Sequence, residues 1–200
     1  MTDRRVVVLV VPAEGTWAPP GRDPDSWRLA MAEDTYEVLA GLDLVDVAVA
    51  VTGGDEQAVR RVAELTWPGT DVFAVDRPLD AVDRVGAAAG VVLVSHDAPD
   101  LPGLLVGKLF RALAHADAAV CPATDGTLVA LGVRTPVADW LWALAPTPDT
   151  PLAALDAAKP RRLAVGLGPG WHRLRGPADI GTLDPGLEGW AATRAMLAGR

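Results

Sequence analysis

Cysteine, lysine and histidine are scarce in this chain of 200 residues, and each shortage excludes a kind of site. The single cysteine, Cys121, excludes an intrachain disulfide and a zinc cluster built from cysteines, and we expect it to pack as a small apolar side chain. Only Lys108 and Lys159 could bring a lysine to a phosphate group. The three histidines do not form the His-Glu-x-x-His motif of zinc proteases.

Long apolar runs and an excess of positive charge are also missing. No apolar segment approaches the ~20 residues needed to cross a bilayer, and the run from Val6 to Val11 is too short for a signal peptide. The net charge of -8 argues against a nucleic-acid or anionic-membrane partner, because both bind basic surfaces. We therefore expect a soluble cytoplasmic protein with neither kind of partner, and leave a homodimer open.

Half of the residues are hydrophobic, and short apolar runs alternate with helical patterns along the chain. Strands are expected over residues 6–11, 45–52, 72–75, 91–95, 118–121, 128–133 and 163–167. Helices are expected over residues 26–40, with Asp25 or Ser26 as the cap, and over 55–65, 79–89, 101–114, 137–144, 152–158 and 187–198. This alternation predicts an α/β fold, a single domain over residues 1–200 with three layers and a mostly parallel sheet. The link after Gly126 is too short for a crossover, so strand 128–133 runs antiparallel or lies elsewhere in a mixed sheet.

The most informative segment is an apolar run, Gly90 to Ser95, that ends on His96 and Asp97. Ligands of open α/β sheets bind outside the carboxyl ends of the strands, so Asp97 is a candidate ligand for a metal that bridges nucleotide phosphates. The alternative is a helix cap, for which Asp100 is the better candidate. His96 either contacts a ligand from the same edge or is a hydrogen-bonded structural histidine.

Two further acids have both a functional and a structural interpretation. Asp125 and Gly126 close the next apolar run, where they present an acid or an amide to an acceptor or form a hairpin turn. Asp34 falls inside the apolar stripe of the helix that follows Ser26. A carboxylate there must be hydrogen-bonded to backbone or face a polar cleft that holds a ligand.

The order of these motifs resembles the DUF2064 family of glycosyltransferase-A-like proteins, which are related to small nucleotidyltransferases. The resemblance rests on Asp34-Thr35, Asp97-Ala98-Pro99, Pro122-Ala123-Thr124-Asp125-Gly126 and Asp179-Ile180-Gly181-Thr182. It implies the fold of nucleotide-diphospho-sugar transferases. It also implies a transferase that depends on a divalent metal, uses a nucleotide or nucleotide-sugar donor and acts on a small-molecule acceptor by glycosyl or nucleotidyl transfer.

The resemblance also implies roles for particular residues. Asp97 and Asp125 are the expected catalytic residues, and Asp97 with Asp179 is expected to hold Mg²⁺ or Mn²⁺. The loop that follows the first strand is expected to bind the nucleotide, and a later glycine-rich loop the acceptor. The nucleotide-binding candidates are Pro12, Gly15, Arg22, Asp34 and His96, and the acceptor candidates are Gly126, Trp171 and His172.

Two departures from the family pattern support a second hypothesis. The first loop has no lysine, so Arg22 and Arg28 are the nearby substitutes, and Gly181 replaces the second acid of the late motif. A cationic group in the first loop would offset phosphate charge during transfer. The alternative is therefore a non-catalytic relative that binds a nucleotide or serves as a partner or regulatory subunit. A third alternative is a phosphate-sugar hydrolase that turns over without an acceptor.

Overall fold

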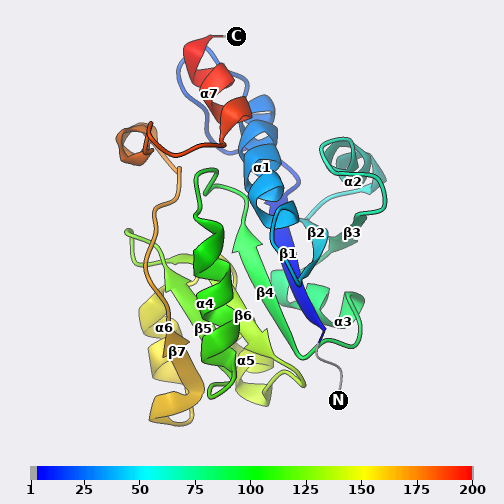
Figure 1. The fold of residues 1–200 in the computed structure, drawn as a ribbon, viewed down its shortest axis with the longest axis vertical. Helices are drawn as coiled ribbons and strands as arrows, with labels where there is room; N and C mark the ends of the chain where they lie inside the picture. The colour runs from blue at the N-terminus through cyan, green and yellow to red at the C-terminus, as the bar shows by residue number, and fades with distance from the viewer. Residues whose placement is uncertain (1–3, 200) are drawn as a thin grey trace.

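The computed structural model describes residues 4–199 and shows a seven-stranded sheet between two layers of helices (Figure 1). The strands are β1 (Arg5–Pro12), β2 (Asp46–Thr52), β3 (Asp71–Val75), β4 (Gly90–Ser95), β5 (Ala118–Pro122), β6 (Leu128–Arg134) and β7 (Val165–Leu167). The α-helices are α1 (Pro24–Ala40), α2 (Glu56–Ala63), α3 (Ala81–Arg84), α4 (Gly103–Leu113), α5 (Asp139–Leu144), α6 (Leu152–Ala158) and α7 (Ala191–Ala198). Short 3-10 helices occupy Pro78–Asp80, Arg162–Ala164 and Pro177–Thr182.

The strands lie in the order β3-β2-β1-β4-β6-β5-β7. Only β6 is antiparallel to its neighbours, β4 and β5. This confirms the predicted mixed, mostly parallel sheet. It also shows that the short link after Gly126 leads into an antiparallel strand. Gly126 has a positive φ of 84°, which glycine adopts without strain, and the chain turns there to bring β6 back along β5.

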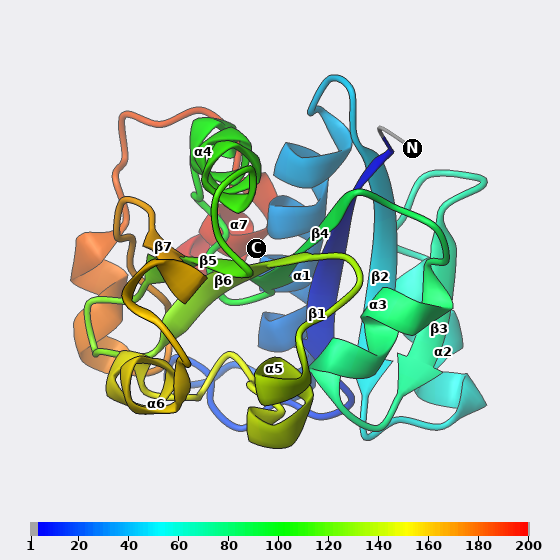
Figure 2. The ribbon, with the colours of Figure 1, turned by 90° about the horizontal axis from the view of Figure 1, so that it is seen from below.

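Helices cover both faces of the sheet (Figure 2). On β1, the side chains of Val7, Leu9 and Val11 pack against α1, α2 and α4, whereas alternate residues face the layer of α3, α5 and α6. A strand that is covered on both faces needs apolar residues at every position, which explains the continuous apolar runs of β1 and β4. Because β1 to β4 are parallel, their carboxyl ends lie on the same side of the molecule.

Several predicted boundaries were wrong, because caps and backbone turns decide where helices end. Helix α1 begins at Pro24 with Asp23 as its cap, since the Asp23 carboxylate accepts a hydrogen bond from the Ser26 amide at 2.8 Å. The helix predicted over 79–89 contracts to a 3-10 turn and the four residues of α3. The closing helix begins only at Ala191. Neither Asp97 nor Asp100 caps α4, which follows Pro102 without a side-chain cap.

Helix α7 packs against α1 through the buried carboxylate of Asp34. Asp34 accepts hydrogen bonds from the backbone amides of Ala192, at 3.0 Å, and Thr193, at 2.7 Å. These are unpaired donors at the amino end of a helix, where a carboxylate is favoured. Trp27 and Trp190 pack in the apolar cluster beside this contact. Asp34 therefore holds together two helices that are distant in the sequence.

We expect Asp34→Ala to lower the free energy of unfolding by about 1–2 kcal/mol, because it leaves two helix-terminal amides without an acceptor. Asp34→Asn should lose less, since the amide oxygen still accepts one bond. Urea unfolding at pH 7 measures both, with Glu33→Ala as the control on the preceding residue. Equal stability of Asp34→Ala and the control would show that this contact does not fix α7.

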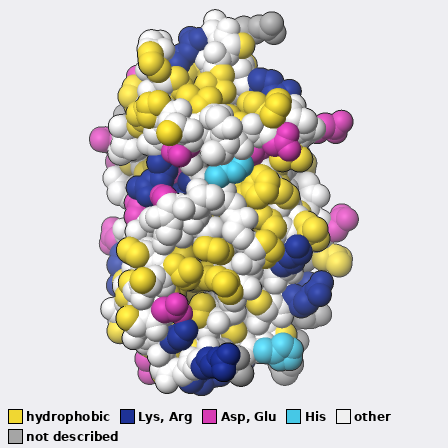
Figure 3. All heavy atoms as spheres, turned by 90° about the vertical axis from the view of Figure 1, so that its left-hand side faces the viewer, with side chains coloured by type: hydrophobic (Ala, Val, Ile, Leu, Met, Phe, Trp, Pro, Cys, Tyr) yellow, Lys and Arg dark blue, Asp and Glu magenta, His cyan; other side chains and the backbone are white. Residues whose placement is uncertain are grey.

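The surface carries both signs of charge. On the face shown in Figure 3, basic side chains lie in separate groups, with acidic and apolar side chains between them. Among residues 4–199, no helix has both the length and the apolar character needed to span a membrane.

Candidate functional site

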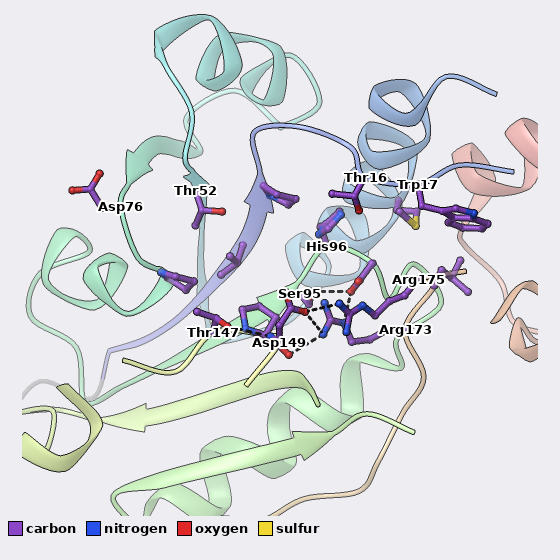
Figure 4. Close-up of a pocket in the computed structure, with 17 residues that line it drawn as sticks. Thr16, Trp17, Thr52, Asp76, Ser95, His96, Thr147, Asp149, Arg173 and Arg175 are labelled. Carbon is purple, nitrogen blue, oxygen red and sulfur yellow. Dashed lines mark hydrogen bonds and ion pairs between the residues drawn. The ribbon is translucent and has the colours of Figure 1, made fainter. Parts of the chain in front are cut away.

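A pocket of about 430 Å³ opens at the carboxyl ends of β1 to β4 (Figure 4). This is the edge at which ligands of open α/β sheets bind. The strands and the loops that follow them supply one part of the lining, and two late segments supply the other. The polar and aromatic lining residues are Thr16, Trp17, Thr52, Asp76, Ser95, His96, Asp97, Thr147, Asp149, Arg173 and Arg175.

The loop after β1 is held against the first turn of α1. The Gly15 amide donates a hydrogen bond to the Asp25 carboxylate at 2.8 Å, and this bond is the main reason why the pKa of Asp25 is lowered. A Cβ atom at Gly15 would lie 2.1 Å from the carbonyl oxygen of Pro24, so only glycine fits this close approach. The loop then places Trp17 in the pocket wall, with its ring edge-on to Trp27 at 5.8 Å.

The two arginines that could replace a first-loop lysine do not line the pocket. Arg28 is buried beneath the loop, where it donates to the Pro12 carbonyl at 2.9 Å and lies 3.5 Å from the Asp25 carboxylate. Arg22 lies beside Gly199, since a Cβ atom at Gly199 would be 2.9 Å from its guanidinium. Cationic groups from other parts of the chain reach the pocket instead.

Asp97 is buried and paired with a buried arginine. Its Oδ1 atom accepts hydrogen bonds from Ser95 Oγ at 2.7 Å and from Arg173 Nε at 2.8 Å. Burial alone would raise the pKa of Asp97, but His96, the Arg173 guanidinium and these two hydrogen bonds bring it below its ordinary value. Asp97 is therefore a carboxylate at neutral pH.

His96 lies next to this pair and lines the pocket. Its amide donates to the Val10 carbonyl at 3.2 Å, and its carbonyl accepts from Thr35 Oγ1 at 2.9 Å, so β1 and α1 fix its backbone. Burial, which disfavours the imidazolium, lowers the pKa of His96 to about 4. The ring is therefore neutral at pH 7.

Arg173 and Arg175 enter the pocket from one extended segment. The Leu174 amide donates to the Asp97 carbonyl at 2.7 Å, which fixes the segment against the end of β4. Arg173 Nη1 donates to the Pro148 carbonyl at 2.8 Å and to Asp149 Oδ1 at 3.2 Å, and Arg175 Nη2 lies 3.1 Å from the same oxygen. Asp149 thus bridges the two arginines, as the dashed lines of Figure 4 show for Arg173.

Of the residues proposed from the sequence, the pocket brings together Pro12, His96 and Asp97. Asp125 lies in an exposed turn, where it accepts from the Thr127 amide at 2.9 Å and pairs with Arg175 at 3.2 Å. Asp179 accepts from the Arg175 amide at 2.9 Å. Neither acid is among the residues that line the pocket.

The proposed acceptor residues Trp171 and His172 are held by Asp100 outside the pocket lining. Asp100 accepts from Trp171 Nε1 at 3.1 Å and is 3.0 Å from His172 Nε2, and the two rings stack at 4.8 Å. Burial alone would raise the pKa of Asp100, but the bonds from His172 and Trp171 lower it. Asp100 thus anchors the segment that leads into Arg173.

The donor set around Asp97 does not fit the divalent ion that the resemblance implies. A metal bound by Asp97 would be close to the Arg173 guanidinium, which already bonds to Oδ1, and the two positive charges would repel each other. Across residues 4–199, no group of three or more His, Cys, Asp or Glu side chains is arranged to hold a metal.

Sequence reasoning missed Arg173, Arg175 and Asp149. The alternation His172-Arg173-Leu174-Arg175 is the signal that could have found the two arginines, because alternate residues of an extended segment share a face. Asp149 carries no comparable signal. It lies in an irregular segment, and only the fold places it between the arginines.

Comparisons with known proteins agree on the fold. A sequence search of the curated proteins found no match. A candidate nucleotide-diphospho-sugar transferase from Desulfovibrio desulfuricans G20 has a similar structure, with a TM-score of 0.70, 21% identity, and 99% of this chain and 96% of that chain covered. CMP:2-keto-3-deoxy-manno-octonic acid synthetase, solved with CTP, matches with a TM-score of 0.57, 13% identity, and coverage of 98% and 99%.

A third similar structure was solved with a metal ion as well as a nucleotide. Glucosyl-3-phosphoglycerate synthase from Mycobacterium tuberculosis, solved with Mn²⁺, UDP and phosphoglyceric acid, matches with a TM-score of 0.57 and 15% identity, over 98% of this chain and 76% of that chain. These likenesses establish the nucleotide-diphospho-sugar transferase type of fold. The model of one sequence family, described as "Uncharacterized protein conserved in bacteria (DUF2064)", matches residues 35–146, which is more than half of the chain. The chain therefore belongs to the DUF2064 family.

Proposed function

We propose that this protein is a transferase that binds a nucleotide-activated donor in the pocket at the carboxyl ends of β1 to β4. The observation that carries the proposal is the position and lining of this pocket in a fold shared with transferases that bind CTP and UDP. Its volume of about 430 Å³ lies within the range of small-molecule sites. Glycosyl and nucleotidyl transfer are the two reaction types that such a donor allows.

The lining supplies groups suited to the base and the nucleoside of such a donor. Trp17 and Met31 form an apolar wall on which a base can stack. Thr16, Thr52 and Asp76 offer hydroxyl and carboxylate groups to the polar edges of a nucleoside. The neutral His96 ring, which lines the adjacent wall, can accept one hydrogen bond and donate another.

Thermal unfolding against nucleoside triphosphates and nucleotide sugars, with and without Mn²⁺, tests the proposal. A ligand at 100 times its dissociation constant should stabilise the protein by about 2.7 kcal/mol. This corresponds to a rise in Tm of roughly 5–10 °C. The shift should shrink in Trp17→Ala and persist in the control Trp67→Ala, because Trp67 lies outside the pocket lining. No shift with any nucleotide would contradict the proposal.

The second candidate is a non-catalytic nucleotide-binding protein with a regulatory or partner role. The observation that supports it is that neither Arg22 nor Arg28 lines the pocket, so neither replaces the missing lysine. Donor turnover in the presence of candidate acceptors separates the two. Nucleotide binding without release of a nucleoside phosphate or of pyrophosphate would favour the non-catalytic protein. Cleavage of the donor by water, without any acceptor, would favour a hydrolase.

A further inference from the structure

The carboxylate of Asp149 occupies a place suited to an anionic ligand. Its Oδ1 atom lies 3.2 Å from Arg173 Nη1 and 3.1 Å from Arg175 Nη2. An oxygen anion between two guanidinium groups is the arrangement in which proteins hold phosphates. The Asp149 side chain is 62% exposed, so it can leave the arginines for water at little cost.

The other acids of this cluster are held more firmly than Asp149. Asp97 is buried and has a second donor in Ser95 Oγ. Asp125 accepts two hydrogen bonds from Thr127 as well as its pairing with Arg175. No side chain other than the two arginines pairs with the Asp149 carboxylate in the part of the chain that the structure describes. Asp149 is therefore the carboxylate that exchanges most easily.

Arg173, which lines the pocket, has one nitrogen that is not engaged by the residues described. The Nε and Nη1 atoms of Arg173 are engaged, whereas Nη2 makes no hydrogen bond to any residue between 4 and 199. Arg173 lines the pocket, and its pairing with Asp97 keeps the guanidinium in place. A phosphate group that replaces Asp149 would gain this donor in addition to those that Asp149 uses.

We infer that Arg173 and Arg175 form a phosphate subsite that Asp149 occupies in the free protein, and that a diphosphate group displaces Asp149 from it without a divalent metal. The inference rests on the proposed function for the identity of the ligand, a nucleotide whose phosphates reach this side of the pocket. Because the exposed carboxylate leaves as the phosphate enters, the exchange limits the negative charge that accumulates beside Asp97. The Arg173 guanidinium supplies at Asp97 the positive charge that a metal supplies in other sites.

Inorganic pyrophosphate is the probe, titrated calorimetrically into the full chain in EDTA and again in Mn²⁺. In EDTA, Asp149→Asn should bind pyrophosphate about fivefold more tightly than the unaltered protein, because the competing charge is gone. Asp139→Asn removes an exposed acid nearby in the sequence that does not line the pocket, so it should change the affinity less than about twofold. Arg175→Gln should weaken binding about tenfold through the loss of one charged donor.

The outcomes separate this inference from the proposed function. Pyrophosphate binding that requires Mn²⁺, or equal affinity of Asp149→Asn and Asp139→Asn, would overturn the inference. If nucleotides bind but pyrophosphate does not, the subsite is wrong and the proposed function stands. If pyrophosphate binds with the expected variant pattern but no nucleotide does, the subsite stands and the proposed function is wrong.

Discussion

Arg173→Leu is expected to lower the free energy of unfolding by about 3–5 kcal/mol, because it leaves the buried Asp97 carboxylate without its charged partner. For a chain of this size the loss corresponds to a fall in Tm of roughly 10 °C. Urea and thermal unfolding at pH 7 measure it. In the unaltered protein the lowered pKa of Asp97 contributes stability above the ordinary aspartate range, which is lost as the pH falls through the pKa of the folded state.

Two further variants show whether this effect belongs to the buried pair. Arg175→Leu removes the same charge two residues later, but its side chain is 41% exposed, so it should cost no more than about 1 kcal/mol. Adding Asp97→Asn to Arg173→Leu should recover part of the loss, because the double variant no longer buries an unpaired charge. Equal losses in Arg173→Leu and Arg175→Leu would show that burial does not set the strength of the pair.

Lowering the pH from 7 to 5 should destabilise the protein through His96. The pKa of His96 falls from its ordinary value near 6.5 to about 4 in the folded state, mainly because of burial. Asp97 and Asp149 oppose this shift, whereas Arg173 and Arg28 add to it. Below pH 6.5, His96 becomes protonated in the unfolded chain but stays neutral in the folded protein. The free energy of unfolding therefore declines until about pH 4. Over the two pH units the loss is about 2 kcal/mol.

Comparing His96→Gln with the unaltered protein separates the contribution of His96 to the pH dependence from that of the carboxylates. His96→Gln should lose about 2 kcal/mol less than the unaltered protein between pH 7 and pH 5, measured by urea unfolding. The exposed His115 is the matched control, and His115→Gln should follow the unaltered protein. If His96→Gln and His115→Gln show the same pH dependence, His96 is not the group responsible.

The sequence predicted the sheet well, because strand position depends on local patterns. Runs such as Val6–Val11 are apolar at every residue only when both faces of a strand are covered, and β1 confirms this. The short link after Gly126 likewise limited the direction of β6. Helix ends were predicted less well. Asp23 rather than Asp25 caps α1, since the cap depends on which side chain reaches a free amide.

Of the residues that line the pocket, only those at the ends of strands were anticipated from the sequence. His96 and Asp97 lie at the end of β4, and both line the pocket. Arg173, by contrast, meets Asp97 across 76 residues of sequence, so no local pattern reveals that pair. The placement of Trp171 and His172 beside Asp100 likewise depends on a contact across more than 70 residues. Such contacts arise from the tertiary fold, so local sequence patterns do not predict them.

The docking of α7 on α1 has a consequence for how the protein is made. The face of α1 that carries Trp27 and Met31 is covered by Leu183, Trp190 and Met196, which are synthesised long after α1. A nascent chain therefore exposes this face of α1 until these residues are made, and the amide of Ala192 reaches Asp34 only after a further 158 residues have been synthesised. Long-range closure of this kind slows folding and leaves apolar surface open to aggregation. The interval between the synthesis of α1 and that of α7 is thus the period in which this apolar surface is most exposed.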